Sequence, residues 1–306
     1  MTHDRLLCLD IETVPDTDVI PPDWPSETFP KAMWHRVVAI SVVEARIERD
    51  DVGERYMVEG CRSGGREDWD ERRLLKAFWQ YFGQRQTRVV TWNGRSFDMA
   101  VLRLRSMIYG IAAEPWFTRG DKWANYGQRY AADWHCDLQE QVSDHGANPR
   151  LGLDDAARAI GLPGKIGGHG SEVGAMVEQG RIGEVRAYCE ADTLNLFGLY
   201  VRWALLTGRA APAGHDASME SLVGFLEAGR DRSPHFGEFL DLWRSSTRPV
   251  PMLVGQTVRP ARTEVNAPAS ARSLASLRRP AARGPQGRRK GFRNHTATSM
   301  ARTSRN

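Results

Sequence analysis

The sequence predicts an α/β fold with a mixed central sheet flanked by helices. Three short apolar runs, at residues 6–11, 37–43 and 56–58, come first and are the right length for buried strands. A helical pattern follows over 69–82, and a further strand at 89–92 leads directly into another helix. Strands that precede a strand–helix alternation are typical of a sheet with both antiparallel and parallel neighbours.

Hydrophobic spacing predicts the helices. The first helical stretch repeats apolar residues at intervals of three and four, which places Leu74, Leu75, Phe78, Trp79 and Phe82 mostly on one face. The same kind of pattern predicts helices at 153–160, 172–178 and 183–206, with two weaker ones around 221–228 and 236–243. Four prolines within 20–31 predict a loop. The aromatic and irregular segment 114–132 fits no regular element.

Charge is unevenly distributed along the 306 residues. Residues 256–306 hold twelve Lys and Arg but only one acid, Glu264, whereas residues 1–255 hold 30 bases and 37 acids. The basic segment is rich in Pro, Ala and Ser without periodicity, so we expect it to be disordered. It could bind nucleic acid through phosphate charge, or serve as a solubilising end or as an arm for another acidic partner.

Neither a membrane span nor a disulfide framework is indicated. No stretch approaches the roughly 20 apolar residues that a span needs, and Asp4 and Asp10 come too early for a signal peptide. The four cysteines, which are Cys8, Cys61, Cys136 and Cys189, lack CxxC spacing. This favours reduced thiols and a cytoplasmic protein. We expect a domain at 1–208, a helical C-terminal extension at 209–249 and a disordered Arg-rich tail at 250–306.

Four acids stand beside apolar runs. Asp10 and Glu12 end the first strand and share one of its faces, because side chains two apart in a strand point the same way. Asp98 follows a strand end through Asn93-Gly94, and Asp192 lies four residues after Tyr188 on a long helix. Taken singly, each has a simpler interpretation: a solvated strand edge or helix cap, an acid favoured by the helix dipole, or the margin of an apolar stripe.

Together, the four acids predict a metal site. Each carboxylate would be destabilised by burial without a counter-charge. Mg²⁺ and Mn²⁺ prefer oxygen ligands, and two such ions about 3.5–4 Å apart form a clamp for in-line phosphoryl displacement. A pair of hard divalent cations would therefore relieve the repulsion between Asp10 and Glu12.

The segments "LDIET", "WNGRSFD" and "YCEAD" resemble the three exonuclease motifs of the DEDD superfamily, in their usual order. Ala187 stands where the DEDDh subclass needs His, and Tyr188 stands where the DEDDy subclass needs Tyr. The fuller resemblance, over about residues 5–207, is to the predicted 3′–5′ exonucleases related to the proofreading domain of family B DNA polymerases. "LDDAARAIGLPGK" and "GRIGEVRAYCEADTLNLFGLYVRW" belong to it as well.

This resemblance implies a ribonuclease H-like fold and a role for each motif residue. Asp10 would bridge both metal ions, with Glu12, Asp98 and Asp192 completing their shells. Tyr188 would orient the attacking water. The ordinary Tyr pKa near 10 makes proton transfer its secondary role.

Three further residues are candidates for substrate binding. Asn93 and Phe97 could line the pocket for the terminal nucleotide, although Phe97 could equally belong to the core. Lys165, in the glycine-rich segment "GKIGGHG", is either a phosphate contact or a solvated turn residue. Asp137 resembles a recurrent element of the family, or it only caps a helix.

The function expected from the resemblance is metal-dependent 3′–5′ exonuclease activity on single-stranded ends, with DNA favoured and nucleoside 5′-monophosphates released. Two alternatives stay open. The same acids would serve an exoribonuclease that trims RNA, and a non-catalytic nucleic-acid-binding module is conceivable. The presence of all four acids argues against the last, because loss of one is the usual sign of a dead site.

Overall fold

A five-stranded sheet in the order β3-β2-β1-β4-β5 occupies the centre of the structure. The structure is a computed structural model that describes residues 3–167, 170–246 and 250–255. β1 runs antiparallel to β2 and parallel to β4, β2 runs antiparallel to β3, and β4 runs parallel to β5. The strands are β1 (Arg5–Pro15), β2 (His35–Asp50), β3 (Gly53–Ser63), β4 (Arg88–Thr91) and β5 (His135–Asp137). The predicted α/β fold with a mixed sheet is confirmed.

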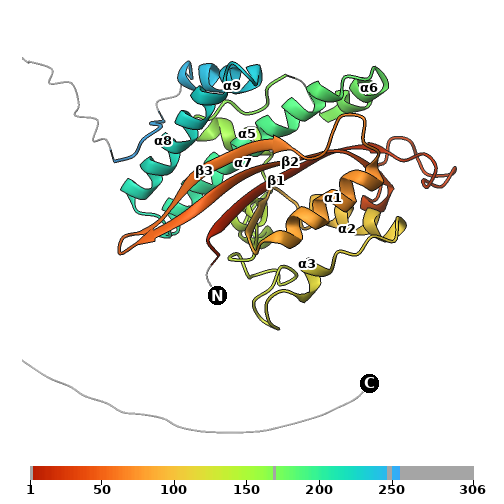
Figure 1. The fold of residues 1–306 in the computed structure, drawn as a ribbon, viewed down its shortest axis with the longest axis horizontal. Helices are drawn as coiled ribbons and strands as arrows, with labels where there is room; N and C mark the ends of the chain where they lie inside the picture. The colour runs from red at the N-terminus through yellow and green to blue at the C-terminus, as the bar shows by residue number, and fades with distance from the viewer. Residues whose placement is uncertain (1–2, 168–169, 247–249, 256–306) are drawn as a thin grey trace, which may run out of the picture. The chain divides into compact units, whose positions relative to one another are not determined.

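Helices cover both faces of this sheet (Figure 1). One face carries α1 (Glu71–Gln84), α2 (Asp98–Ile108) and α3 (Glu114–Thr118). The other carries α5 (Leu153–Ala159), α7 (Ile182–Leu206), α8 (Pro212–Gly229) and α9 (Pro234–Arg244). The shorter elements are α4 (Leu138–Val142), α6 (Val173–Glu178), and the 3-10 turns η1 (Ala32–Trp34), η2 (Asp144–Gly146) and η3 (Gly170–Glu172). None of the described helices is long and apolar enough to cross a membrane.

Alternation along β1 divides the core into two layers. Leu7, Leu9 and Ile11 pack toward α1 and α2, whereas Leu6 and Cys8 pack toward α7, and all five are buried. Full burial of a leucine side chain contributes about 1.5–3 kcal/mol, so the register of β1 is strongly determined. The two positions that continue the α7-facing series are the acids of the first motif.

The C-terminal extension covers the edge strand. The Ser218 and Ser221 hydroxyls of α8 accept hydrogen bonds from the backbone N–H groups of Tyr56 and Val58 on β3, at 2.8 and 2.9 Å. These N–H groups would otherwise be free to pair with another chain. α8 begins at Pro212, earlier than its hydrophobic spacing predicts, because proline is well accommodated in the first turn of a helix. The predicted boundary between 208 and 209 stays a prediction.

Two short elements were not predicted from the sequence. β5 has only three residues, and the segment 114–132 forms the short helix α3 followed by turns. The four cysteines are free and buried, with Cys8 and Cys136 in the layer under α7. The predicted basic tail lies outside the described residues, apart from 250–255.

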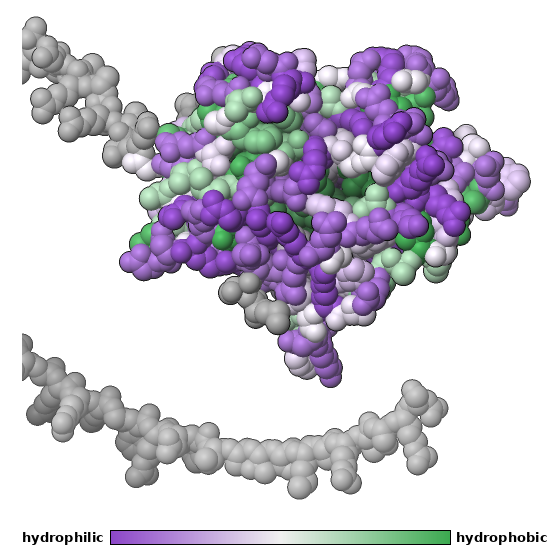
Figure 2. All heavy atoms as spheres, viewed as in Figure 1, coloured by the Kyte–Doolittle hydropathy of each residue, from purple (hydrophilic) through white to green (hydrophobic). Residues whose placement is uncertain are grey.

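An apolar hollow lies on the face opposite α7. Figure 2 shows a mostly hydrophilic surface with apolar side chains gathered near its centre. A pocket of about 180 Å³ in this layer is lined mainly by Ile40, Val42, Leu74, Phe78 and Tyr81. It is separate from the acids of β1, which point to the other face of the sheet.

Candidate active site

Asp10 and Glu12 point from β1 toward α7 and are partly exposed. Burial, followed by the charges of Asp98, Glu12 and Asp192, raises the pKa of Asp10 well above its ordinary range. Burial and then the charge of Asp192 raise the pKa of Glu12 to about 8. The carboxylates of separate motifs therefore influence one another, and the repulsion expected from the sequence is present in the fold.

A tight turn after β4 carries the second motif. Asn93 has a left-handed backbone (φ 64°), and a Cβ at Gly94 would lie 2.4 Å from the Thr91 side chain. The Asp137 carboxylate accepts the backbone N–H groups of Asn93 and Arg95 at 3.0 and 2.9 Å. Asp137 also caps α4, as the sequence had suggested. It has a second role as well, because it fixes the start of the segment that leads to Asp98.

Asp98 is the first residue of α2 and is 3% exposed. The backbone N–H groups of Asp98 itself and of Ile11 on β1 act to lower the pKa of this carboxyl. Burial nevertheless raises the pKa of Asp98 to about 7. The Asp98 carboxylate therefore lies close to the strand that bears Asp10 and Glu12, and its charge raises the pKa of both.

The third motif lies on α7. Asp192 is 6% exposed, and its Oδ1 atom has no hydrogen-bond partner among the described residues. Burial raises the pKa of Asp192 to about 6, although the Lys165 ammonium and a hydrogen bond from the Tyr188 hydroxyl act in the opposite direction. Burial and then the charge of Asp192 raise the pKa of Tyr188, so its phenol stays protonated at neutral pH.

Lys165 is held over this motif by its loop. The Asn195 amide of α7 accepts the Gly164 N–H at 3.1 Å and donates to the Gly164 carbonyl at 2.7 Å. Asp154 accepts the Lys165 N–H at 2.7 Å. These bonds place the Lys165 Nζ atom 5.7 Å from the centre of the Tyr188 ring. The Lys165 ammonium acts to lower the pKa of Glu12 and Asp192, and its role as a phosphate contact stays a prediction.

The other two substrate candidates lie near the second motif. Phe97 directly precedes Asp98 and packs against His35 and Phe29, with ring centres 5.0 and 5.8 Å away. Phe29 is 71% exposed, so this aromatic group reaches solvent. The Asn93 side-chain oxygen faces Arg150 at 3.3 Å. No contact between Asn93 and the four acids is present in the described residues, and its substrate role stays a prediction.

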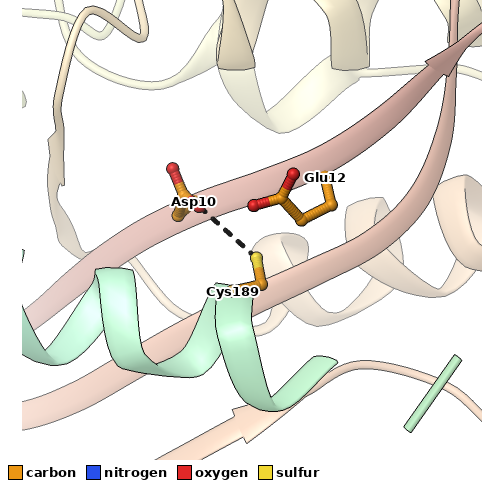
Figure 3. Close-up of side chains that lie close together, drawn as sticks. All are labelled: Asp10, Glu12 and Cys189. Carbon is orange, nitrogen blue, oxygen red and sulfur yellow. Dashed lines mark hydrogen bonds between the residues drawn. The ribbon is translucent and has the colours of Figure 1, made fainter. Parts of the chain in front are cut away.

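The donor set suits a hard divalent cation. Ligand atoms of Asp10, Glu12 and Cys189 lie within 4.8 Å of one another, and Figure 3 shows all three side chains turned toward a common point. Asp192 supplies a buried oxygen that has no hydrogen-bond partner in the part of the chain that the structure describes. Carboxylates whose pKa values are raised by burial and mutual repulsion gain most from a cation between them.

The mixed sheet and its acids define the class: an α/β domain that brings carboxylates together from three segments, with Asp10 and Glu12 on β1, Asp98 at the start of α2 and Asp192 on α7. The chain belongs to the family described as "Predicted 3′–5′ exonuclease related to the exonuclease domain of PolB", which it matches over residues 27–243. This match includes Asp98, Tyr188 and Asp192, whereas Asp10 and Glu12 precede it.

Among solved structures, the chain is similar to the family B DNA polymerase from the hyperthermophilic archaeon Pyrobaculum calidifontis, at 16% identity and a TM-score of 0.43. The similarity covers 72% of this chain and 29% of the polymerase. A search of curated proteins found no match.

Two residues near the site had no assigned role in the sequence. Asn195 looked like one polar residue among the apolar positions of α7, and Cys189 looked like part of its buried stripe. Their positions one turn or less from Asp192 were the only available signal. Only the fold shows that Asn195 holds the Lys165 loop and that the Cys189 thiol contacts Asp10.

Proposed function

We propose that this protein is a metal-dependent 3′–5′ exonuclease that removes nucleoside 5′-monophosphates from single-stranded ends, with DNA as the favoured substrate. One observation carries the proposal: ligand atoms of Asp10 and Glu12 lie within 4.8 Å of each other, and the buried carboxylates of Asp98 and Asp192, from two other segments, are near enough to raise the pKa of both. Such a group is costly without a ligand, and a pair of Mg²⁺ or Mn²⁺ ions fits its oxygen donors.

The four carboxylates would hold these ions. When bound, the ions would lower the pKa of a coordinated water and stabilise charge on the attacked phosphate. The remaining steps belong to the side chains of this chain, and the reaction is an in-line displacement at the terminal phosphodiester bond.

Tyr188 would orient the attacking water through its hydroxyl group. Its raised pKa keeps the phenol protonated, so it acts by donating and accepting hydrogen bonds and does not serve as a permanent base. Lys165 would contact the phosphate, because its loop holds the ammonium beside Tyr188. The exposed ring group of Phe29 and Phe97 offers an apolar surface on which the terminal base could stack.

Digestion of end-labelled oligonucleotides tests the proposal. A 5′-labelled strand incubated with Mg²⁺ or Mn²⁺ should shorten one nucleotide at a time, and chelation should stop the reaction. DNA and RNA, each single- and double-stranded, should be compared at the same salt concentration. Preferential shortening of RNA would reassign the protein to the exoribonucleases.

Variants separate the site from contaminating nucleases. Asp98→Asn and Asp192→Asn should each abolish nucleotide release. Asp241→Asn is a matched control, because this carboxylate is exposed on α9, where it pairs with Arg230. Full activity in Asp192→Asn would refute the proposed site. Binding of oligonucleotide without cleavage under every metal condition would favour the non-catalytic module.

A further inference from the structure

The group of acids contains one donor of a different kind. The Cys189 thiol donates a hydrogen bond to Asp10 Oδ2 at 3.5 Å, and its sulfur belongs to the same cluster of ligand atoms as the Asp10 and Glu12 oxygens (Figure 3). Cys189 is fully buried, on the turn of α7 that precedes Asp192. A soft sulfur atom therefore lies directly beside two hard oxygen donors.

A second observation points to a cation at this position. Asp192 is 6% exposed, its Oδ1 atom lacks a hydrogen-bond partner within the described part of the chain, and its charge acts on both Asp10 and Glu12. A buried carboxylate whose charge acts on two other carboxylates, and which has an oxygen without a hydrogen bond, gains from a positive partner. Asp192 and Cys189, three residues apart on α7, thus both act on Asp10: the first through its charge and the second through its thiol.

We infer that this group also binds thiophilic divalent cations of the zinc and cadmium class, through Asp10, Glu12 and Cys189. Mg²⁺ and Mn²⁺ take oxygen ligands and would leave the thiol uncoordinated, whereas Zn²⁺ and Cd²⁺ favour thiolate sulfur together with carboxylate oxygen. On coordination the thiol releases its proton to solvent, and the sulfur replaces one water of the ion. Binding there would compete with the catalytic ions, because Asp10 and Glu12 would serve as ligands in both cases.

The inference rests on the proposed function only where it expects these cations to inhibit the nuclease. Binding of the cations is expected whether or not the protein is a nuclease. Titration of the metal-free full-length protein with Cd²⁺, followed by the ultraviolet charge-transfer band of a cadmium–thiolate bond, measures binding without any nuclease assay. Cys189→Ser is the test variant. Cys61→Ser is the matched control, because Cys61 is also buried but its sulfur contacts Glu190 and Thr193.

The wild type and Cys61→Ser should develop the band at one ion per chain, and added Mn²⁺ should reduce it. Cys189→Ser should lack the band and bind Cd²⁺ at least about tenfold more weakly, since even an indirect partner of a metal ligand contributes that much. Its Mn²⁺ affinity should change far less. Cadmium NMR of the wild type gives a second measurement that needs no variant, because the shift distinguishes sulfur from all-oxygen coordination.

Absence of the band in the wild type, its persistence in Cys189→Ser, or an all-oxygen cadmium shift would overturn the inference. If cadmium binds through Cys189 while neither Mg²⁺ nor Mn²⁺ supports cleavage, the proposed function fails and the inference stands. If cleavage occurs but no sulfur coordination is seen, only the inference fails.

Discussion

Removing the charge of Asp192 is expected to stabilise the protein when no metal is bound. Burial raises the pKa of this carboxyl from an ordinary 3.8 to about 6. Such a rise corresponds to about 3 kcal/mol of lost stability once the group is ionised. Asp192 is 6% exposed, so solvent screens little of this cost. Asp192→Asn should therefore unfold at a temperature about 6–12 °C higher at pH 8.

The pH dependence follows from the direction of the pKa change. The folded protein keeps the Asp192 proton to a higher pH than the unfolded chain, so the penalty is absent below the ordinary pKa. It grows as the pH rises from about 4 through 6 and is complete above that range. The advantage of Asp192→Asn should therefore vanish near pH 3 and reach its maximum at pH 8.

Thermal unfolding with a chelator, measured between pH 3 and 8, checks this reasoning. Asp154→Asn is a control of opposite sign. Burial opposes ionisation of Asp154, but the Lys165 N–H and the Arg158 side chain outweigh it and hold the Asp154 pKa below its ordinary value. Asp154→Asn should lower stability at pH 8. An Asp192→Asn protein that is less stable than wild type at pH 8 without metal would refute the argument.

Metal should reverse the order of stability. At a free Mn²⁺ concentration about 1,000 times the dissociation constant, wild type should gain about 4.1 kcal/mol, which exceeds the advantage of about 3 kcal/mol expected for Asp192→Asn without metal. Asp192→Asn should gain much less, because a neutral amide replaces a charged carboxylate of the proposed metal site.

Three other substitutions have defined outcomes. Tyr188→Phe should slow turnover yet leave Mn²⁺ affinity largely intact by isothermal titration. Asn195→Ala removes both hydrogen bonds to the Gly164 backbone; it should cost about 1–3 kcal/mol in urea unfolding and lower kcat/KM for oligonucleotides. Ser218→Ala leaves the Tyr56 N–H without its partner and should cost about 1–3 kcal/mol without changing metal affinity.

Each of these outcomes can fail in an informative way. Loss of Mn²⁺ binding in Tyr188→Phe would make the tyrosine part of the scaffold. If Asn195→Ala lowered kcat/KM as much in a Lys165→Ala background as in wild type, its effect would not act through the lysine. Unchanged unfolding of Ser218→Ala would show that water replaces the hydroxyl at the edge strand.

The sequence was sufficient to predict most of the secondary structure. Most helices appear close to their predicted ranges, because a period of 3.6 residues reflects which face of a helix is buried. The strands β1, β2 and β3 were found but extend well beyond the apolar runs that predicted them. Elements without a period were missed: β5 is three residues long, and its place in the sheet depends on β4, which lies more than forty residues earlier. The first turns of α8 were also missed, because small residues there leave no clear apolar spacing.

The sequence by itself also determined which acids could act together, through their types and their motif spacing. Only the tertiary structure decided the burial, the hydrogen-bond partners and the pKa values of these acids. The unpartnered oxygen of Asp192, the thiol beside Asp10 and the amide of Asn195 that holds the Gly164 loop all depend on which segments meet in space. The physical reason is that a pKa, a desolvation cost or a shared ligand position arises from contacts between residues far apart in the chain, and local periodicity carries no record of such contacts.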